Sequence, residues 1–248
     1  MSETMTHEIG FFLLIPIVAF LYAAVGHGGA SGYLALMALF SFSPEVMRPT
    51  ALLLNLFVAG IAFYQYFKRG YFNQRLFWPF AIASIPMAYL GGYLELDASL
   101  YKKILGAFLV FAVIRMLDLF GRESERIRPI QTWHGLLTGA VIGFFSGLIG
   151  IGGGIILTPV ILLFHWGKMK EAACVSALFI WVNSTAGLIG QLHSGVTFSS
   201  GSILMVALAL LGGSLGAYLG SRYLSGMVLK RILAVVLLMA SIKLILIP

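Results

Sequence analysis

The sequence is poor in cysteine and in charged residues, and both shortages narrow the classes of protein it can encode. Cys174 is the single cysteine among 248 residues, which excludes an intramolecular disulfide and a metal site built from several cysteines. Only 10% of the residues are charged, whereas 60% are hydrophobic and the mean hydropathy is +0.97. This composition excludes an ordinary soluble domain. We therefore predict a membrane protein that crosses the bilayer several times.

Motifs for catalysis and for metal binding are also missing. The chain contains no H-E-x-x-H and no P-loop lysine motif, and its single G-x-S-x-G match, Gly212 to Gly216, lies inside an apolar run and not at a strand-to-helix turn, so we expect no enzyme activity, no catalytic residue and no cofactor. Acidic residues do not pair inside any apolar segment, which argues against a metal site and against a metal-cation transporter. The formal charge of +7 does not indicate nucleic-acid binding, because the basic residues lie in short clusters between apolar runs.

Apolar runs occupy most of the chain and predict an all-α membrane protein. Ten runs share this character, and they span roughly residues 11–25, 30–42, 47–67, 76–94, 99–117, 135–149, 155–165, 172–192, 200–221 and 226–247. Six of them approach the ~20 residues that a spanning helix needs. The first ten residues carry Glu3 and Glu8 but no Lys or Arg, so they lack the basic part of a signal peptide. We expect both termini on the non-cytoplasmic side of the membrane.

Two glycine-rich stretches interrupt these runs. The first tip is Gly26-His27-Gly28-Gly29-Ala30-Ser31-Gly32, and the second tip is Gly150-Ile151-Gly152-Gly153-Gly154. Consecutive glycines lose so much backbone entropy in a helix that each tip should break it. Backbone groups freed at membrane depth need partners in protein, in a water-filled cavity or in a ligand. Each tip-containing run is too long for one crossing and too short for two, so we predict a helical hairpin or a pair of truncated helices.

The chain also repeats itself. Gly26-x-Gly28-Gly29 recurs 124 residues later as Gly150-x-Gly152-Gly153, and Lys102-Lys103-Ile104-Leu105 resembles Lys230-Arg231-Ile232-Leu233 at a spacing of 128. We predict a first transmembrane repeat over residues 1–121, a polar cytoplasmic linker over 122–134 and a second repeat over 135–248. The register between these anchors stays open. Matching Gly70 with Gly195 gives 125 residues, whereas matching Asn55 with Asn183 gives 128.

The distribution of charge predicts how the two halves are oriented. If each tip-containing run crosses twice, or dips in and returns, most basic residues fall on one side, around Arg69, Arg126, Lys168 and Lys230. A single broken crossing would put the basic loops near Arg126 and Lys168 on opposite sides, so we reject it. About five helical segments per half, 8 to 10 of them crossing or re-entering, make the halves an inverted tandem repeat. Whether the tips dip or join full crossings stays open.

The tips predict a site for an anion. A helix that restarts near Gly29 or Ala30 points its unpaired N–H groups and the positive end of its dipole at the tip. Two such ends make a cradle that needs no fixed cation, and Ser31 adds a hydroxyl donor. The alternative is helix packing, which Gly150 and Gly154 also fit as a small-xxx-small pair. Packing does not call for consecutive glycines, so we favour ligand contact at the tips, and packing for the Gly212, Gly216, Gly220 series.

Polar residues on the helices after the tips complete the candidate site. Asn183 and Gln191 share one helical face with Gly187, although such amides also join helices by hydrogen bonds. His27 could titrate in a proton-coupled cycle or make a structural hydrogen bond. Arg48 could guide anions or snorkel to the interface. The predicted substrate-binding residues are those of the two tips and their polar neighbours: Gly26, His27, Gly28, Gly29, Ala30, Ser31, Asn55, Gly150, Gly152, Gly153, Gly154, Asn183, Ser184 and Gln191.

These residues resemble those of a known family. The duplicated tips, Pro159 shortly after the second tip, and Gly70 and Gly195 at the ends of the following helices are similar to the sulfite exporter TauE/SafE family of membrane transporters. The resemblance covers nearly the whole chain. It implies an inverted-repeat carrier for sulfite, organosulfonates or related sulfur oxyanions in the cytoplasmic membrane of a bacterium. The first tip lacks the proline that follows the second.

Three functions fit these observations. The first is a secondary transporter that exports a small oxyanion by alternating access, with one repeat rocking against the other. An inside-negative membrane favours anion exit by roughly 2.3 kcal/mol per charge per 100 mV. The second is an uptake permease or channel for the same anions, and the third is a membrane scaffold that transports nothing. The expected partners are the oxyanion and the lipid bilayer, with a proton or another ion if transport is coupled, while the oligomeric state is not predicted.

Overall fold

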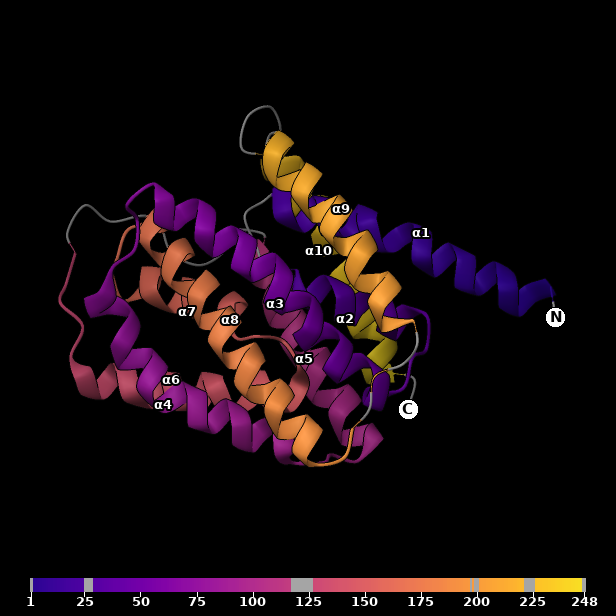
Figure 1. Ribbon diagram of the computed structural model, residues 1–248, viewed down its shortest axis with the longest axis horizontal. Helices are drawn as coiled ribbons and strands as arrows, with labels where there is room; N and C mark the ends of the chain where they lie inside the picture. Colours follow the sequence, from indigo (N-terminus) through magenta and orange to yellow (C-terminus); the bar gives the residue numbers. More distant parts are fainter. Residues whose placement is uncertain are drawn as a thin grey trace.

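Every regular element in the described part of the chain is an α-helix, which confirms the predicted all-α fold (Figure 1). The computed structural model describes residues 2–24, 29–116, 127–196, 198, 201–220 and 226–246. Its helices, in chain order, are α1 (Ser2–Ala24), α2 (Ala30–Leu39), α3 (Pro44–Lys68), α4 (Gln74–Tyr93), α5 (Ala98–Met116), α6 (Thr132–Ile149), α7 (Gly154–Leu163), α8 (Met169–His193), α9 (Ser202–Gly220) and α10 (Gly226–Leu246).

The lengths of these helices suit a membrane protein. Helices α3, α6 and α8 are long and apolar enough to cross a bilayer, with 25, 18 and 25 residues. Helices α2 and α7, which follow the tips, have only ten residues each. Ten residues make about 15 Å of helix, half of a ~30 Å hydrocarbon core. Each tip is therefore followed by a half-length helix, as the prediction of truncated helices requires.

Gly29 of the first tip and Gly153 of the second have the same backbone conformation, 124 residues apart. Gly29 caps α2 with φ 80° and ψ −14°, and Gly153 caps α7 with φ 78° and ψ −16°. A positive φ is costly for residues with a Cβ, so glycine at these two positions is a requirement of the turn. These two glycines are therefore structural equivalents as well as sequence repeats.

The structure also gives the alignment of the helices that follow the two tips, which the sequence left open. Helices α3 and α8 both have 25 residues and begin at residues 44 and 169, a difference of 125. Each is followed by a glycine with positive φ, Gly70 at 75° and Gly195 at 89°. The alignment of Gly70 with Gly195 is thus confirmed, and the alignment of Asn55 with Asn183 is wrong. Asn55 instead occupies the position of Ile180.

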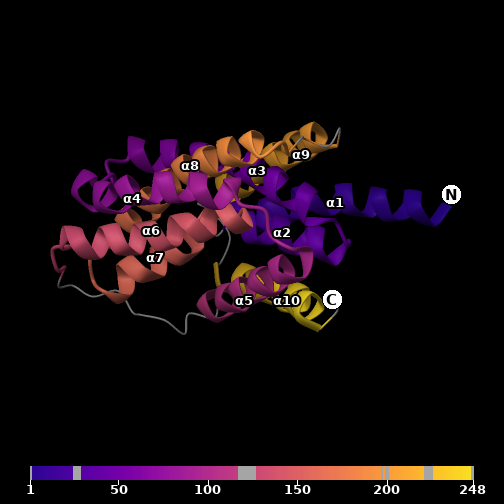
Figure 2. The ribbon, with the colours of Figure 1, turned by 90° about the horizontal axis from the view of Figure 1, so that it is seen from below.

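The two halves interlock. Helix α4 of the first half packs on α6 of the second, and α9 of the second packs on α1 of the first (Figures 1 and 2). Glycines make both contacts close: Gly139, Gly143 and Gly147 of α6 lie against the backbone of α4. On the other side, Gly212 and Gly216 lie against the backbone of α1, which confirms the predicted packing role of these two glycines.

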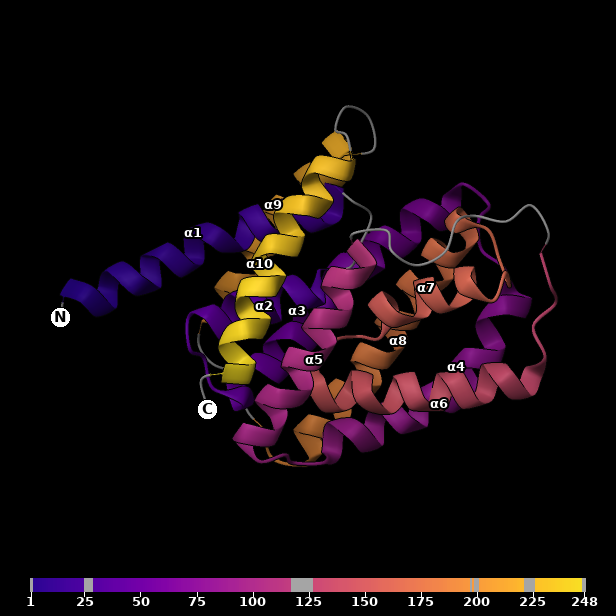
Figure 3. The same cartoon turned by 180° about the vertical axis from the view of Figure 1, so that it is seen from behind.

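Helices α3 and α8 cross at the centre of the molecule and run antiparallel. Leu52 lies against Gly187, Asn55 against Ser184 and Gly60 against Trp181, so residue numbers rise along one helix as they fall along the other. Helix α2 folds back along α1, because Ser31 contacts Tyr22 and Phe40 contacts Phe11. Helices α5 and α10 pair on one side of this assembly, as the view from behind shows (Figure 3).

Candidate functional site

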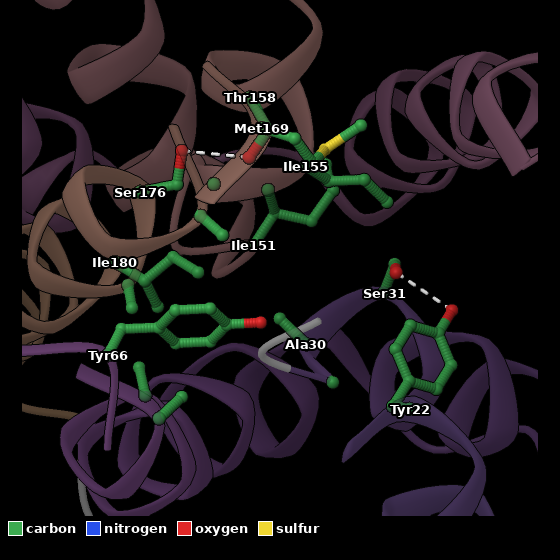
Figure 4. A pocket seen from close by; sticks show the side chains of 16 residues that line it. Tyr22, Ala30, Ser31, Tyr66, Ile151, Ile155, Thr158, Met169, Ser176 and Ile180 are labelled. Atoms are coloured by element: carbon green, nitrogen blue, oxygen red, sulfur yellow. Dashed lines mark hydrogen bonds between the residues drawn. The ribbon is translucent and has the colours of Figure 1, made fainter. Parts of the chain in front are cut away.

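A cavity of about 130 Å³ lies between the two tips (Figure 4). Gly29, Ala30 and Ser31 line it from the first tip, and Gly154 and Ile155 line it from the second. The same space is closed laterally by α3, through Ala59 to Tyr66, and by α8, through Met169 to Ile180. The cavity has room for several water-sized groups. Two half-helices that are far apart in the sequence therefore begin at one small chamber.

Hydroxyl groups supply the side-chain polarity of this cavity. Among the residues that the structure describes, the lining includes five of them and no charged side chain: Tyr22, Ser31, Tyr66, Thr158 and Ser176. The hydroxyls of Tyr22 and Ser31 are 2.9 Å apart, and Thr158 donates to Ser176 Oγ at 2.8 Å. Figure 4 shows the Tyr66 hydroxyl directed towards Ala30. The chamber is thus neutral and can offer several hydrogen bonds to a solute.

The backbone of each tip adds donors to the chamber. The first amides of α7 to bond within the helix are those of Ile156 and Leu157, which donate to the Gly153 carbonyl. The amides of Gly154 and Ile155 therefore have no acceptor among the described residues. The corresponding amides of α2 belong to Ala30 and Ser31, since Gly32 and Tyr33 donate to the Gly29 carbonyl.

The two helix starts also bring partial charge to the chamber. Each helix N-terminus carries roughly half a positive charge. No side chain in the described part of the chain caps either helix. Two uncapped starts that meet at one small space suit a small anion better than a neutral or cationic solute.

The mouth of the cavity lies where α3 ends and α8 begins. Met169 is 45% exposed and Tyr66 is half-buried, whereas the lining residues of α2 and α7 are buried. Basic residues surround this end, and Lys170 Nζ donates to the Tyr71 hydroxyl at 3.1 Å. Lys68 lies 4.4 Å above the ring of Tyr64. The cavity therefore opens beside the basic loops for which the charge pattern predicts a cytoplasmic position.

The predicted site residues of the tips divide into two groups in the structure. Gly29, Ala30, Ser31 and Gly154 line the cavity. Gly26, His27 and Gly28 lie outside the described residues. The expected titration or structural hydrogen bond of His27 stays a prediction for that reason.

The other predicted glycines pack against neighbouring helices. A Cβ on Gly152 would lie 2.6 Å from Asn55 Nδ2, and one on Gly150 would lie 3.0 Å from the Arg48 carbonyl oxygen. A Cβ on Gly153 would lie 2.8 Å from the ring of Phe179. These glycines shape the second tip from behind, and their role in binding stays a prediction.

Four predicted polar side chains, those of Asn55, Asn183, Ser184 and Gln191, do not line the cavity. Asn55 Nδ2 donates to Ser184 Oγ at 3.3 Å and joins α3 to α8. Asn183 Nδ2 donates to the Phe179 carbonyl in its own helix at 2.9 Å. Gln191 is buried, with no hydrogen-bond partner at either side-chain amide atom. None of these four side chains lines the cavity described above.

Arg48 does not take the snorkelling role considered from the sequence, whereas its role in guiding anions stays a prediction. It is only 7% exposed, so it does not snorkel to an interface. Its Nη2 donates to the carbonyls of Gly91, Gly92 and Leu94, at 3.4, 3.3 and 3.0 Å. These carbonyls end α4, so the guanidinium caps the negative end of that helix.

Sequence reasoning did not include Tyr22, Tyr66 and Thr158 in the site. An aromatic residue in an apolar run is usually core, and only the fold of α2 back onto α1 brings Tyr22 to Ser31. Ser176 is recognisable in the sequence as an intramembrane polar residue, but the predicted site does not include it. The signal that identifies it is its spacing of four from Ile180, which lines the cavity from the same face of α8.

Comparisons with known proteins point to one family. The profile of the family "Sulfite exporter TauE/SafE" matches residues 11–244. A probable membrane transporter protein y4hK of Sinorhizobium fredii is 42% identical over 96% of this chain and 98% of its own. A probable membrane transporter protein MJ0441 of Methanocaldococcus jannaschii is 28% identical over 75% of each chain. The probable membrane transporter protein YunE of Bacillus subtilis is 24% identical over 82% of this chain. No solved structure matches.

Proposed function

We propose that this chain, which belongs to the sulfite exporter TauE/SafE family, is a secondary transporter that moves small sulfur oxyanions out of the cell. Membership of the family makes it a membrane transporter. Our proposal adds three points to family membership. The substrate is sulfite, an organosulfonate or a similar anion, the direction of transport is export, and the protein lies in the cytoplasmic membrane. The observation that carries the proposal is the neutral chamber between two uncapped helix starts.

An oxyanion suits the donors of this chamber. Backbone amides at Ala30, Ser31, Gly154 and Ile155 converge from two helices, and hydroxyls supply the remaining polar contacts. Amide and hydroxyl donors satisfy the oxygens of an anion through charge-assisted hydrogen bonds. Because no fixed cation neutralises the ligand, binding stays weak enough for release, which a carrier requires at each turnover.

The direction of the open cavity supports an inward-facing state. Its mouth is beside Lys68 and Lys170, in loops whose charge predicts a cytoplasmic position. The antiparallel course of the equivalent helices α3 and α8 supports the inverted orientation of the two repeats, because a two-fold axis in the membrane plane reverses helix direction. An anion from the cytoplasm would reach the tips through this mouth.

The moving bodies draw helices from both halves. Glycine contacts hold α9 to α1 and α4 to α6, so neither repeat can rock as a separate unit without breaking close backbone packing. In our proposal α1 and α9 move as one body, and α4 and α6 move as the other. The tips lie between these bodies and stay near the axis of the motion.

Counterflow in proteoliposomes tests the function. Vesicles loaded with unlabelled sulfite and diluted into a trace of radiolabelled sulfite should accumulate label transiently, because a carrier exchanges faster than it leaks. Label that equilibrates without transient accumulation would indicate a channel. Absence of flux for sulfite, thiosulfate and short sulfonates would discard the proposed substrate class and favour a scaffold. Ser176→Ala should reduce exchange, whereas Ser84→Ala, buried away from the cavity, should not.

A further inference from the structure

Several buried polar groups have no partner in the structure. Seven side-chain N or O atoms of the described residues are buried without a hydrogen bond: Tyr33 Oη, Arg48 Nε, Asn55 Oδ1, Ser146 Oγ, Asn183 Oδ1, Gln191 Nε2 and Gln191 Oε1. A buried polar atom without a partner destabilises the folded protein, because it has lost its hydrogen bonds to water. Each of these groups calls for an explanation, since buried polar atoms are nearly always satisfied.

The internal repeat supplies the reason. Each residue that lines the open cavity has an equivalent in the other half, 124 residues away along the tip-containing segments and 125 residues away along α3 and α8. Tyr66 of the cavity corresponds to Gln191, and Ala59 corresponds to Ser184. From the second half to the first, Ala173 corresponds to Arg48.

The remaining equivalences follow the same rule. Ile180 corresponds to Asn55, and Tyr22 corresponds to Ser146. Five of the seven unpaired atoms thus belong to four residues that mirror the lining of the open cavity. Direct contacts keep part of this set together, because Asn55 bonds to Ser184 and Gly152 lies against both side chains.

We infer that Arg48, Asn55, Ser146, Ser184 and Gln191 line a second vestibule that is closed in this structure and leads the anion from the tips to the opposite face. This inference rests on the proposed function and deepens it. The two vestibules differ chemically. The open one has hydroxyls and no charge, whereas the closed one holds a guanidinium and amide groups. Opening the second vestibule gives the unpaired atoms water or the anion as partners.

The end of α4 closes this vestibule. Gly92 lies against the Gly187 carbonyl, and Gly190 lies against the Tyr89 carbonyl, so α4 and α8 meet backbone to backbone. We call this contact the α4–α8 seam. Arg48 completes the closure through its bonds to the carbonyls of Gly91 and Gly92. The equivalent seam between α9 and α3 is looser, because a Cβ on Gly213 would lie 3.9 Å from Val58. The closed vestibule therefore lies beside the tight α4–α8 seam, and the open vestibule lies beside the looser contact between α3 and α9.

Arg48 has a defined task in this arrangement. While α4 is packed, its charge faces three backbone carbonyls and, among the described residues, no carboxylate within salt-bridge distance. When α4 moves away, the guanidinium loses these acceptors and becomes free to bind an anion through paired N–H groups. An anion in the second vestibule thus stabilises the open seam, which couples binding at that face to opening.

Thiol labelling tests the inference without reference to the substrate. Cys174→Ala removes the single native cysteine, and Gln191→Cys then reports the second vestibule while Ala62→Cys reports the open cavity. In this background Gln191→Cys should resist membrane-impermeant maleimide from both faces. Adding Gly92→Ala, whose Cβ would meet the Gly187 carbonyl, should raise labelling of Gln191→Cys from the non-cytoplasmic face about tenfold or more and lower labelling of Ala62→Cys from the cytoplasmic face. Gly213→Ala is the matched control and should change neither rate.

The outcomes separate the inference from the proposed function. Gly190→Ala is a second variant at the contact between α4 and α8, in case Gly92→Ala does not fold. A third measurement labels Gln191→Cys during sulfite counterflow in protein that keeps both glycines. If Gln191→Cys stays unreactive from both faces in every folded protein while Ala62→Cys keeps its reactivity, the second vestibule does not exist. Reciprocal labelling without any sulfite flux would support the vestibule and contradict the proposed substrate.

A sided affinity measurement tests the role of Arg48. Arg48→Gln should raise the half-saturating sulfite concentration at the non-cytoplasmic face about tenfold or more and leave the cytoplasmic value within about twofold. Arg48→Lys should restore part of the loss, because it keeps the charge but not the paired donors. Equal losses at both faces would show that Arg48 only holds α4 in place, and would overturn its assignment as an anion ligand.

Discussion

The hydroxyl of Ser31 should contribute directly to anion binding. Ser31 is 3% exposed, lines the cavity at the start of α2, and has its Oγ 2.9 Å from the Tyr22 hydroxyl. One of these two hydroxyls can donate to the other while the second points its proton into the chamber. A hydrogen bond to a charged partner is worth about 1.5–3 kcal/mol. Ser31→Ala should therefore weaken sulfite binding about 10- to 150-fold.

How far Ser31→Ala weakens sulfite binding within this range depends on Tyr22. In Ser31→Ala the Tyr22 hydroxyl loses its partner and can turn to the anion, which would place the loss near the lower end. Ser31→Ala with Tyr22→Phe removes both donors and should give the larger loss. The two residues touch, so their effects should not add.

Calorimetric titration of the detergent-purified protein with sulfite measures this affinity, and counterflow gives the matching half-saturation. Ser84→Ala is the control, because Ser84 is fully buried and its Oγ donates to the Ala81 carbonyl of its own helix at 3.3 Å. It should leave the affinity within about twofold. If Ser31→Ala folds and binds sulfite as tightly as Ser84→Ala does, the assignment of the chamber between the tips is wrong.

Three other predictions test the fold that positions the chamber. Gly153→Ala should lower the free energy of unfolding by about 2–5 kcal/mol, because the residue is strained at φ 78° and its Cβ would lie 2.8 Å from Phe179. Gly195→Ala introduces only backbone strain, so its free energy of unfolding should fall by about 1–2 kcal/mol in the same denaturation assay. Asn55→Ala and Ser184→Ala should each destabilise the protein, and a double-mutant cycle should give a coupling of about 0.5–1.5 kcal/mol. Cys174 is fully buried, so it should react with maleimide only after unfolding.

Most of the fold was accessible from the sequence. Ten apolar runs became ten helices, because a chain in a bilayer must bond its backbone internally and hydrophobic length then sets the helices. The spacing of 124 between the tips predicted the equivalence of Gly29 and Gly153, which share one backbone conformation. The interlocking of α4 with α6 and of α9 with α1 was not accessible, since glycine spacing identifies a packing face but not the helix that covers it.

The candidate site was accessible only in part. The tips could be located from the sequence, because consecutive glycines in an apolar run interrupt the helix at a defined point. Tyr22 and Tyr66 could not be distinguished from core aromatics, since their hydroxyls reach the cavity only through the packing of α1 and α3 around the tips. The polar residues Asn55 and Gln191 were identifiable as candidates, but the sequence does not tell which side of the tips is open.

The central claim is that both glycine tips bind one anion, and the most direct measurement is a crystallographic map of the protein soaked with selenite, a heavier analogue of sulfite. The account predicts one anomalous peak in the cavity, within hydrogen-bond distance of the amides of Ala30 or Ser31 from α2 and of Gly154 or Ile155 from α7. A peak confined to the basic loops around Lys168 and Lys170, with the chamber empty at saturating selenite, would contradict it.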